Sequence, residues 1–341
     1  MLTKRENLIE VMRGGTPDRF VNQYEAFSLI MGVPVSPYKR TPYGGEISRD
    51  GWGVSKIWPE GTPGAFPLHD KEHLVCPDIT HWQDYVKAPQ THYTDGAWEG
   101  VMRQEAGVDR KEKFALVFLN SGLFETCHNL LGLEECLVSF YEEPECMHEL
   151  IDYIKQYQLE AAKEICGYLK PDGIFLHDDW GTQLSTFISA EMFEEFFVPA
   201  YKEIYGYYKS RGAGLVVHHS DSYGATLVPY MIDMGINIWQ GVLSTNNIPE
   251  LIQKYGPKIT FMGGVDDGKV DVPDWTPQLV EDEVQKACME NGGLYYIPSL
   301  CQGLPFSIYP GVHDAVTGCI DKMSKQMFRI DGAWKKGDCS Q

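Results

Sequence analysis

Side chains that bind metals or transfer protons follow several short apolar segments of this 341-residue chain. His219 and Asp221 come directly after the apolar run 214–217, and Cys301 follows a second such run far along the chain. Imidazole, carboxylate and thiolate groups all bind zinc, and three protein ligands leave a fourth position open for a substrate. The spacing therefore predicts a zinc site at His219, Asp221 and Cys301. Short metal patterns are loose, so an alternative stays open in which His219 contacts substrate, Asp221 caps a helix and Cys301 is an inert buried thiol.

A second group of polar residues, His177, Asp178 and Asp179, ends another apolar segment. Two adjacent carboxylates repel each other, which raises the pKa of one of them and makes a proton donor available near neutral pH. We therefore predict that these three residues are catalytic. In the alternative interpretation one aspartate caps the following helix, and the other pairs with a cation outside the site.

Further polar or aromatic residues stand at or near the ends of the remaining apolar segments. The predicted substrate contacts are Tyr24, Asn120, Trp180, Gln240 and Asp266. Asp266 follows two glycines that would let a ligand approach the backbone, although Asp and Gly are also ordinary residues in a turn. The aromatic residues could line a pocket for an aryl group, or simply belong to the core.

The elements that must position these residues alternate between strand and helix from residue 114 onward. Predicted strands are 115–119, 173–177, 215–219, 236–240, 259–263 and 294–298, with 20–24 as a further candidate. Residues 147–169 and 190–210 have the pattern of long amphipathic helices. Apolar strands that alternate with helices indicate a parallel sheet covered on both faces. No Gly-x-Gly-x-x-Gly follows a strand, which favours a (β/α)8 TIM barrel over an open dinucleotide-binding sheet, and a barrel brings the strand ends together at one mouth.

Length and composition indicate one domain. We expect a single barrel domain over 1–330, in which 1–110 form an N-terminal helix and covering loops and 111–330 form the main βα repeats; 331–341 would be a C-terminal tail. The nine cysteines contain no Cys-x-x-Cys pair, which does not indicate a disulfide framework.

Charge and hydropathy exclude some partners. The net charge of −19 would repel nucleic acid and anionic membranes. The N-terminus lacks the apolar core of a signal peptide, and no apolar stretch approaches the ~20 residues that span a bilayer. We therefore expect a cytoplasmic protein without a nucleic-acid or membrane partner.

Extended motifs resemble the uroporphyrinogen decarboxylase superfamily, in particular its corrinoid-dependent methyltransferase branch. The similarity runs to about residue 328 and includes residues 5–7 and 13–19, Asp50-Gly51-Trp52-Gly53-Val54, Gly122-Leu123-Phe124-Glu125, 131–135, Asp178-Asp179-Trp180-Gly181-Thr182-Gln183, 196–202, His219-Ser220-Asp221, Gly263-Gly264-Val265-Asp266 and Cys301. The resemblance implies a (β/α)8 barrel whose mouth receives a corrinoid (cobalamin) protein. In zinc-dependent members a His-x-Cys pair and a later Cys bind the metal. His219 and Cys301 match that pattern, whereas Asp221 stands where the first Cys would be.

The same resemblance leaves several activities to compare. Uroporphyrinogen decarboxylases have an Arg-rich segment that binds the substrate's carboxylates, but residues 21–27 here contain no Arg and carry a Glu. We therefore expect a cobalamin-dependent O-demethylase component that moves methyl from a methoxylated, aromatic small molecule to the cobalt of a corrinoid protein. The alternatives are methyl transfer from a methylcorrinoid to a thiol or tetrahydrofolate, uroporphyrinogen decarboxylation, and a degenerate barrel that only binds.

Overall fold

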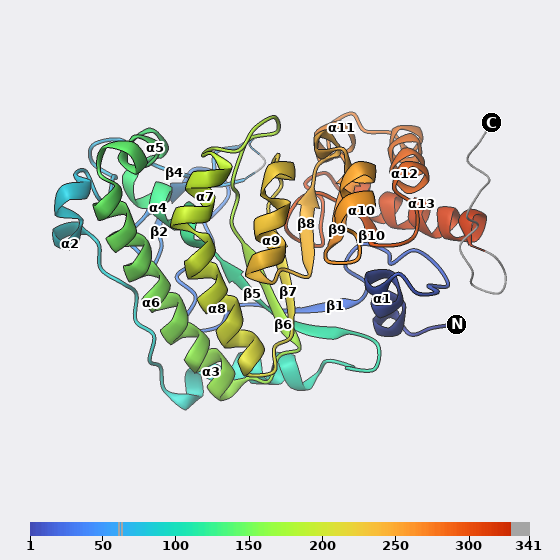
Figure 1. Ribbon diagram of the computed structural model, residues 1–341, viewed down its shortest axis with the longest axis horizontal. Coiled ribbons are helices and arrows are strands. Elements are labelled where there is room, and N and C mark those ends of the chain that lie inside the picture. Colours follow the sequence, from blue (N-terminus) through green and yellow to red (C-terminus); the bar gives the residue numbers. More distant parts are fainter. Residues whose placement is uncertain (61, 63, 329–341) are drawn as a thin grey trace.

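A curled parallel sheet forms the centre of the computed structural model, which describes residues 1–60, 62 and 64–328 (Figure 1). Its seven strands are ordered β1-β5-β6-β7-β8-β9-β10, and every neighbouring pair is parallel. Their bounds are β1 Phe27–Ile30, β5 Phe114–Asn120, β6 Gly173–His177, β7 Leu215–His219, β8 Ile238–Val242, β9 Thr260–Val265 and β10 Tyr296–Leu300. A single apolar cluster joins side chains from all seven strands, so the sheet curls around its own inner face. The TIM-barrel class predicted from the sequence is confirmed.

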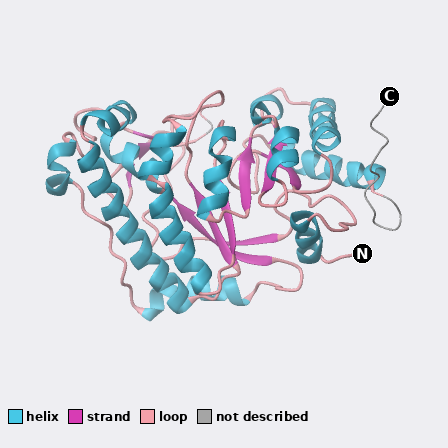
Figure 2. Cartoon of the chain, viewed as in Figure 1, coloured by secondary structure: helices cyan, strands magenta, loops and turns pink. Residues whose placement is uncertain are grey.

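Helices cover the outer face of this sheet (Figure 2). They are α3 Asp95–Ala106, α4 Leu123–Leu131, α5 Leu133–Glu142, α6 Pro144–Tyr168, α7 Ala190–Phe196, α8 Val198–Ser210, α9 Val228–Met234, α10 Ile248–Tyr255, α11 Asp267–Val270, α12 Pro277–Asn291 and α13 Val312–Met327, with short 3-10 turns at Ala225–Leu227 and Ser244–Asn246. The largest apolar cluster lies between the sheet and α3 to α10, and a separate cluster packs α11, α12 and α13 against β9 and β10. Both faces of the strands are therefore buried, as their nearly continuous apolar sequences predicted.

The position of the eighth barrel strand is filled only in part. Between β10 and β1 the chain follows an irregular course through residues 20–26, and the backbone N–H of Gln23 donates to the carbonyl of Pro298 in β10 at 3.2 Å. The chain then turns and pairs with β5 through β1. Gln23 has a φ of 51°, a left-handed conformation that no regular strand contains. The predicted strand 20–24 is therefore absent, and the regular strand begins at Phe27.

The N-terminal part of the chain closes one end of the barrel and adds a small second sheet. Helix α1, Lys4–Arg13, has a capping box between Thr3 and Glu6, and its buried Leu8 and Val11 belong to the inner apolar cluster. Strands β2 Ser48–Arg49, β3 Ser55–Ile57 and β4 Phe66–Pro67 form an antiparallel sheet, followed by Ile79–His81 and α2 Trp82–Tyr85. Covering loops and short helices were expected here, and the small sheet was not.

Three predicted elements differ from the structure for local reasons. Predicted strand 236–240 begins at Ile238, because the N–H of Ile236 still bonds the carbonyl of Met231 in the cap that ends α9. Predicted strand 294–298 begins at Tyr296, since Tyr295 has a φ of 59°. Predicted helix 190–210 is divided at Phe197, where Pro199 cannot donate a hydrogen bond to the preceding turn.

Among the described residues, no helix has the length and apolar character needed to cross a membrane. The predicted tail 331–341 lies outside the described residues.

Candidate functional site

The alternation of side chains along each strand decides which polar residues face the barrel interior. Phe175 of β6 and Val217 of β7 belong to the inner apolar cluster, so the residues two positions further on, His177 and His219, point to the same side. Gln240 in β8 stands in the same relation to the inward-facing Ile238. These polar groups come at the carboxyl ends of neighbouring strands and meet at the barrel mouth.

The mouth contains a compact cluster of His177, Asp179 and His219. One nitrogen or oxygen ligand atom from each residue lies within 4.8 Å of the others, and this is the group among the described residues that could hold a metal ion. The two imidazole rings have centroids 4.3 Å apart, and Nε2 of His219 lies 3.6 Å from Oδ1 of Asp179. Asp221 joins through its backbone, whose N–H donates to the same Asp179 oxygen at 3.1 Å.

The two histidines carry different charges because their neighbours differ. Burial lowers the pKa of His219 to about 4, so its ring is neutral. Burial would also lower the pKa of His177, but the charges of Glu125 and Asp179 and the hydrogen bond that His177 donates to Glu125 raise it to about 10. Burial raises the pKa of Asp179 to about 6, against the opposing charge of His177. Protons can therefore reside at this site near neutral pH.

Asp178 faces the opposite direction and caps helix α4. It is fully buried and accepts hydrogen bonds from the backbone N–H groups of Phe124 (3.2 Å) and Glu125 (2.7 Å), from Nε1 of Trp180 (2.8 Å) and from the hydroxyl of Tyr201. Burial raises its pKa to about 7. Asp178 was predicted to be catalytic, but its side chain points away from the mouth. Its contacts agree with the alternative in which one aspartate of the pair caps a helix.

Two residues hold the histidine rings from behind. Nδ1 of His177 lies 3.0 Å from Oε2 of Glu125 in α4, and Nδ1 of His219 contacts Oε1 of Gln240. Gln240 was predicted as a substrate contact, but it is fully buried behind His219. Glu125 was not among the predicted site residues. Its place at the third position of the helix after β5 was a usable signal, because a strand end and the next helix start share the mouth.

Cys301 does not join the histidines. Its thiol is 1% exposed and donates weakly to the carbonyls of Val242 (3.5 Å) and Val265 (3.4 Å), and burial raises its pKa well above the ordinary range. The predicted set of His219, Asp221 and Cys301 is therefore not brought together as ligands among the described residues.

The remaining predicted substrate contacts have partners within the protein. Trp180 is 2% exposed and stacks on His218 at 4.0 Å, while Asp266 caps α11 by accepting from the N–H of Gly268 and lies 3.3 Å from Nζ of Lys269. Tyr24 donates to the carbonyl of Gln302 at 3.1 Å and packs against Phe175 inside the barrel. Tyr24 also lines an open groove.

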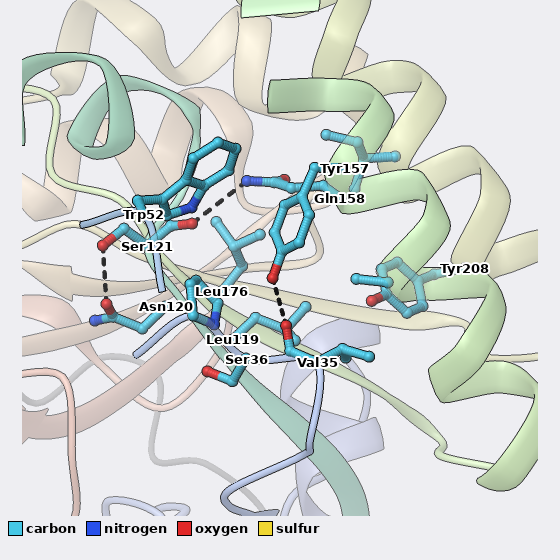
Figure 3. A pocket seen from close by; sticks show the side chains of 13 residues that line it. Val35, Ser36, Trp52, Leu119, Asn120, Ser121, Tyr157, Gln158, Leu176 and Tyr208 are labelled. Atoms are coloured by element: carbon cyan, nitrogen blue, oxygen red, sulfur yellow. Dashed lines mark hydrogen bonds between the residues drawn. The ribbon is translucent and has the colours of Figure 1, made fainter. Parts of the chain in front are cut away.

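Figure 3 shows Asn120 beside a small cavity that Trp52 and Tyr157 also line. The cavity has a volume of about 40 Å³, whereas a benzene-sized cavity needs about 150 Å³. Oδ1 of Asn120 accepts from the hydroxyl of Ser121 at 2.9 Å. This cavity is therefore a packing gap and too small for an aromatic substrate.

A larger groove follows the incompletely filled strand position. We call it the seam groove; its volume is about 770 Å³ and its walls include Tyr24, Phe27, Leu29, Leu304 and Phe306. The loop that carries Leu304 and Phe306 also approaches the cluster of His177, Asp179 and His219 at Gly303, where an added Cβ would lie 3.1 Å from atoms of both His177 and His219. One loop thus separates the groove from the cluster.

Comparison with known proteins identifies the family. The profile of the uroporphyrinogen decarboxylase (URO-D) family matches residues 111–323, more than half of the chain, and the chain belongs to this family. The resemblance to the uroporphyrinogen decarboxylase superfamily recognised in the sequence is confirmed. A search of curated proteins finds no match.

One solved structure shares the fold of this chain. A methyltransferase from Methanosarcina mazei matches with a TM-score of 0.59 and 12% identity, over 95% of this chain and 99% of that one. A B12-independent methionine synthase from Shewanella sp. W3-18-1, solved with selenomethionine, matches with a TM-score of 0.44 and 14% identity, over 71% of this chain and 68% of that one. The first likeness shows a shared fold, and the second score is too low to indicate one.

Proposed function

We propose that this protein is a corrinoid-dependent methyltransferase. It would move a methyl group from a methoxylated small molecule, in particular an aromatic one, to the cobalt of a corrinoid carried by a separate protein. The observation that carries the proposal is the cluster of His177, Asp179 and His219 at the mouth of a barrel that has the fold of a methyltransferase. The absence of Arg from residues 21–27 supports methyl transfer over decarboxylation of a polycarboxylate.

The chemistry requires the leaving oxygen to be neutralised. Transfer breaks the O–CH3 bond, the corrinoid cobalt supplies the electron pair that takes the methyl group, and the ether oxygen leaves as an alkoxide or phenolate. His177 and Asp179 can hold a proton near neutral pH and deliver it to this oxygen. His219 is neutral and offers an imidazole nitrogen at the same place.

The donor set of the mouth also suits zinc, since two imidazoles and a carboxylate with an open position are typical of catalytic zinc. A zinc ion bound there would act as a Lewis acid toward the ether oxygen. His219 belongs both to this cluster and to the ligand set expected from the sequence. Activation of the ether oxygen by proton donation and activation by a zinc ion would depend on the same side chains.

The seam groove is the proposed substrate site. Its apolar walls from Phe27, Leu29, Leu304 and Phe306 suit an aryl group, and Tyr24 adds a hydroxyl at its inner side. A volume of about 770 Å³ is within the range typical of small-molecule pockets. The loop at Gly303 would have to move for the methoxy group to reach the cluster.

An anaerobic assay with cob(I)alamin tests the function. We expect a panel of methoxylated benzoates and phenols to yield methylcobalamin, which is followed by its absorbance, and no decarboxylation of uroporphyrinogen. His219→Ala should lower the rate by at least about 10²-fold, whereas His148→Ala, an exposed histidine on α6, should not change it. Turnover of uroporphyrinogen without methyl transfer would replace this proposal by the decarboxylase alternative.

A further inference from the structure

Hydrogen bonds behind His219 determine which of its nitrogens faces the barrel mouth. Nε2 of Gln240 lies 3.1 Å from the carbonyl oxygens of both Cys301 and Gln302, so it must be the amide NH2 group. Oε1 of Gln240 therefore faces Nδ1 of His219, and Nδ1 must carry the proton. Nε2 of His219 is left with its lone pair directed toward Asp179.

A carboxylate orients the second imidazole in the same way. Oε2 of Glu125 accepts from Nδ1–H of His177 at 3.0 Å, which leaves Nε2 as the nitrogen that faces the mouth. Glu125 is itself placed by α4, whose first turn Asp178 caps from β6. Acceptors behind the Nδ1 atoms of metal-binding histidines are the usual means of fixing the ring and its tautomer.

The thiol expected from the family pattern does not take part. Its hydrogen-bond partners are the carbonyls of β8 and β9, and the backbone N–H of Cys301 donates to Asp267 at 2.8 Å. The loop that begins at this residue is held further by the bond between Gln302 and Gln240. Rotation of the thiol toward the histidines would give up both carbonyl contacts.

We propose that Nε2 of His177, a carboxylate oxygen of Asp179 and Nε2 of His219 form a divalent-metal centre of the zinc class, with Glu125 and Gln240 as positioning residues and without Cys301. The centre has nitrogen and oxygen ligands only, so it is a harder, more Lewis-acidic site than a thiolate site and suits activation of an ether oxygen. The inference specifies the metal of the proposed methyltransferase, but metal binding does not require that methyl transfer occurs.

Metal content measured on the full-length protein tests the ligand set. After chelator treatment and reconstitution with Zn²⁺, we expect about one zinc per chain in the wild type and in Cys301→Ser, and loss of most of it in His177→Gln, Asp179→Asn and His219→Gln. Cys288→Ser, which changes another buried cysteine, is the matched control. Circular dichroism and thermal unfolding identify any variant that fails to fold.

Cobalt provides a readout that distinguishes the two ligand sets directly. The Co²⁺-substituted wild type should show d–d bands without the near-ultraviolet charge-transfer band of a cobalt–thiolate bond. That band, or zinc lost in Cys301→Ser and kept in folded His177→Gln, would establish the thiolate set and overturn the proposal. A wild type that binds neither ion would also overturn it, while leaving methyl transfer by proton donation intact.

The positioning roles have their own test. Gln240→Leu and Glu125→Ala should each weaken Zn²⁺ affinity by roughly 10- to 100-fold, and Glu125→Gln, which keeps an acceptor oxygen, should recover part of the loss. Gln156→Leu, at an exposed position of α6, should bind Zn²⁺ like the wild type. Unchanged affinity in Gln240→Leu and Glu125→Ala would show that these residues do not hold the rings.

Discussion

Adjacent aspartates just after β6 have different partners because successive side chains at a strand end point in opposite directions. Asp179 shares the inner side with His177, whereas Asp178 extends outward to the start of α4. Gly122 makes this contact possible, since a Cβ at that position would lie 2.3 Å from Cβ of Asp178. Four donors surround the Asp178 carboxylate, and one of them, Tyr201, is fully buried.

Substitution by Asn should separate the two roles. In Asp178→Asn an amide NH2 replaces an acceptor among four donors, so we expect a loss of about 1–3 kcal/mol in the free energy of unfolding. Asp179→Asn should unfold like the wild type but transfer methyl about 10²- to 10⁴-fold more slowly. Urea unfolding and initial rates measure the two effects. Wild-type stability of Asp178→Asn would contradict its role as a cap.

At the scale of elements, an ion-pair cluster fastens helix α1 to the closed end of the barrel. Asp172, just before β6, accepts from Arg5 of α1 at 3.0 Å, from Arg110 at 2.8 Å and from the N–H of Ala115 in β5 at 2.8 Å. Burial would raise the pKa of Asp172, but these hydrogen bonds and the two guanidinium charges outweigh burial and lower it. The carboxylate form is thus preferred in the folded protein.

The lowered pKa predicts a pH-dependent contribution to stability. A carboxyl with a lower pKa in the folded state stabilises the fold above its unfolded value of about 4, and the contribution disappears as the pH falls through the folded value. Asp172→Asn should therefore lower the free energy of unfolding by about 1–3 kcal/mol at pH 7, and the difference from the wild type should shrink below about pH 4. Urea titrations of both proteins at several pH values measure it. A difference that stays constant down to the lowest pH would contradict the assigned cause.

At the scale of the whole molecule, the incomplete eighth strand leaves a groove in a barrel that is otherwise filled. The inner apolar cluster occupies the interior below the histidines, and α1 closes the opposite end. In the proposed function, substrate would reach the cluster of His177, Asp179 and His219 from the mouth or along the seam groove beside β1 and α13.

Filling the groove tests this route. Ser28 lies in β1 on the groove wall, and Ser28→Trp should raise KM for the methoxylated substrate by roughly tenfold or more, equivalent to about 1.4 kcal/mol. Ser210→Trp, at the exposed end of α8, should leave KM unchanged. Steady-state kinetics measure KM for both variants, and thermal unfolding shows whether each variant is folded. An unaltered KM in a folded Ser28→Trp variant would place the substrate elsewhere.

Local pattern in the sequence determined the class of fold and the neighbourhood of the site. The runs that became β6 and β7 were predicted residue for residue, because apolar, β-branched segments of about five residues need no long-range information to be recognised. The rule that parallel strands end at one mouth then placed His177, Asp179, His219 and Gln240 together.

Only the tertiary structure decided which of those groups lie close enough together to bind one metal ion. It also decided which groups contact the histidine rings from behind. β10 begins two residues later than its pattern indicated, and a thiol just past its end is directed into carbonyls of β8 and β9. Glu125 reaches His177 because Gly122 and Asp178 fix the start of α4 against β6. Such contacts depend on the relative stagger of strands and on loop direction, which are set by packing between segments remote in sequence.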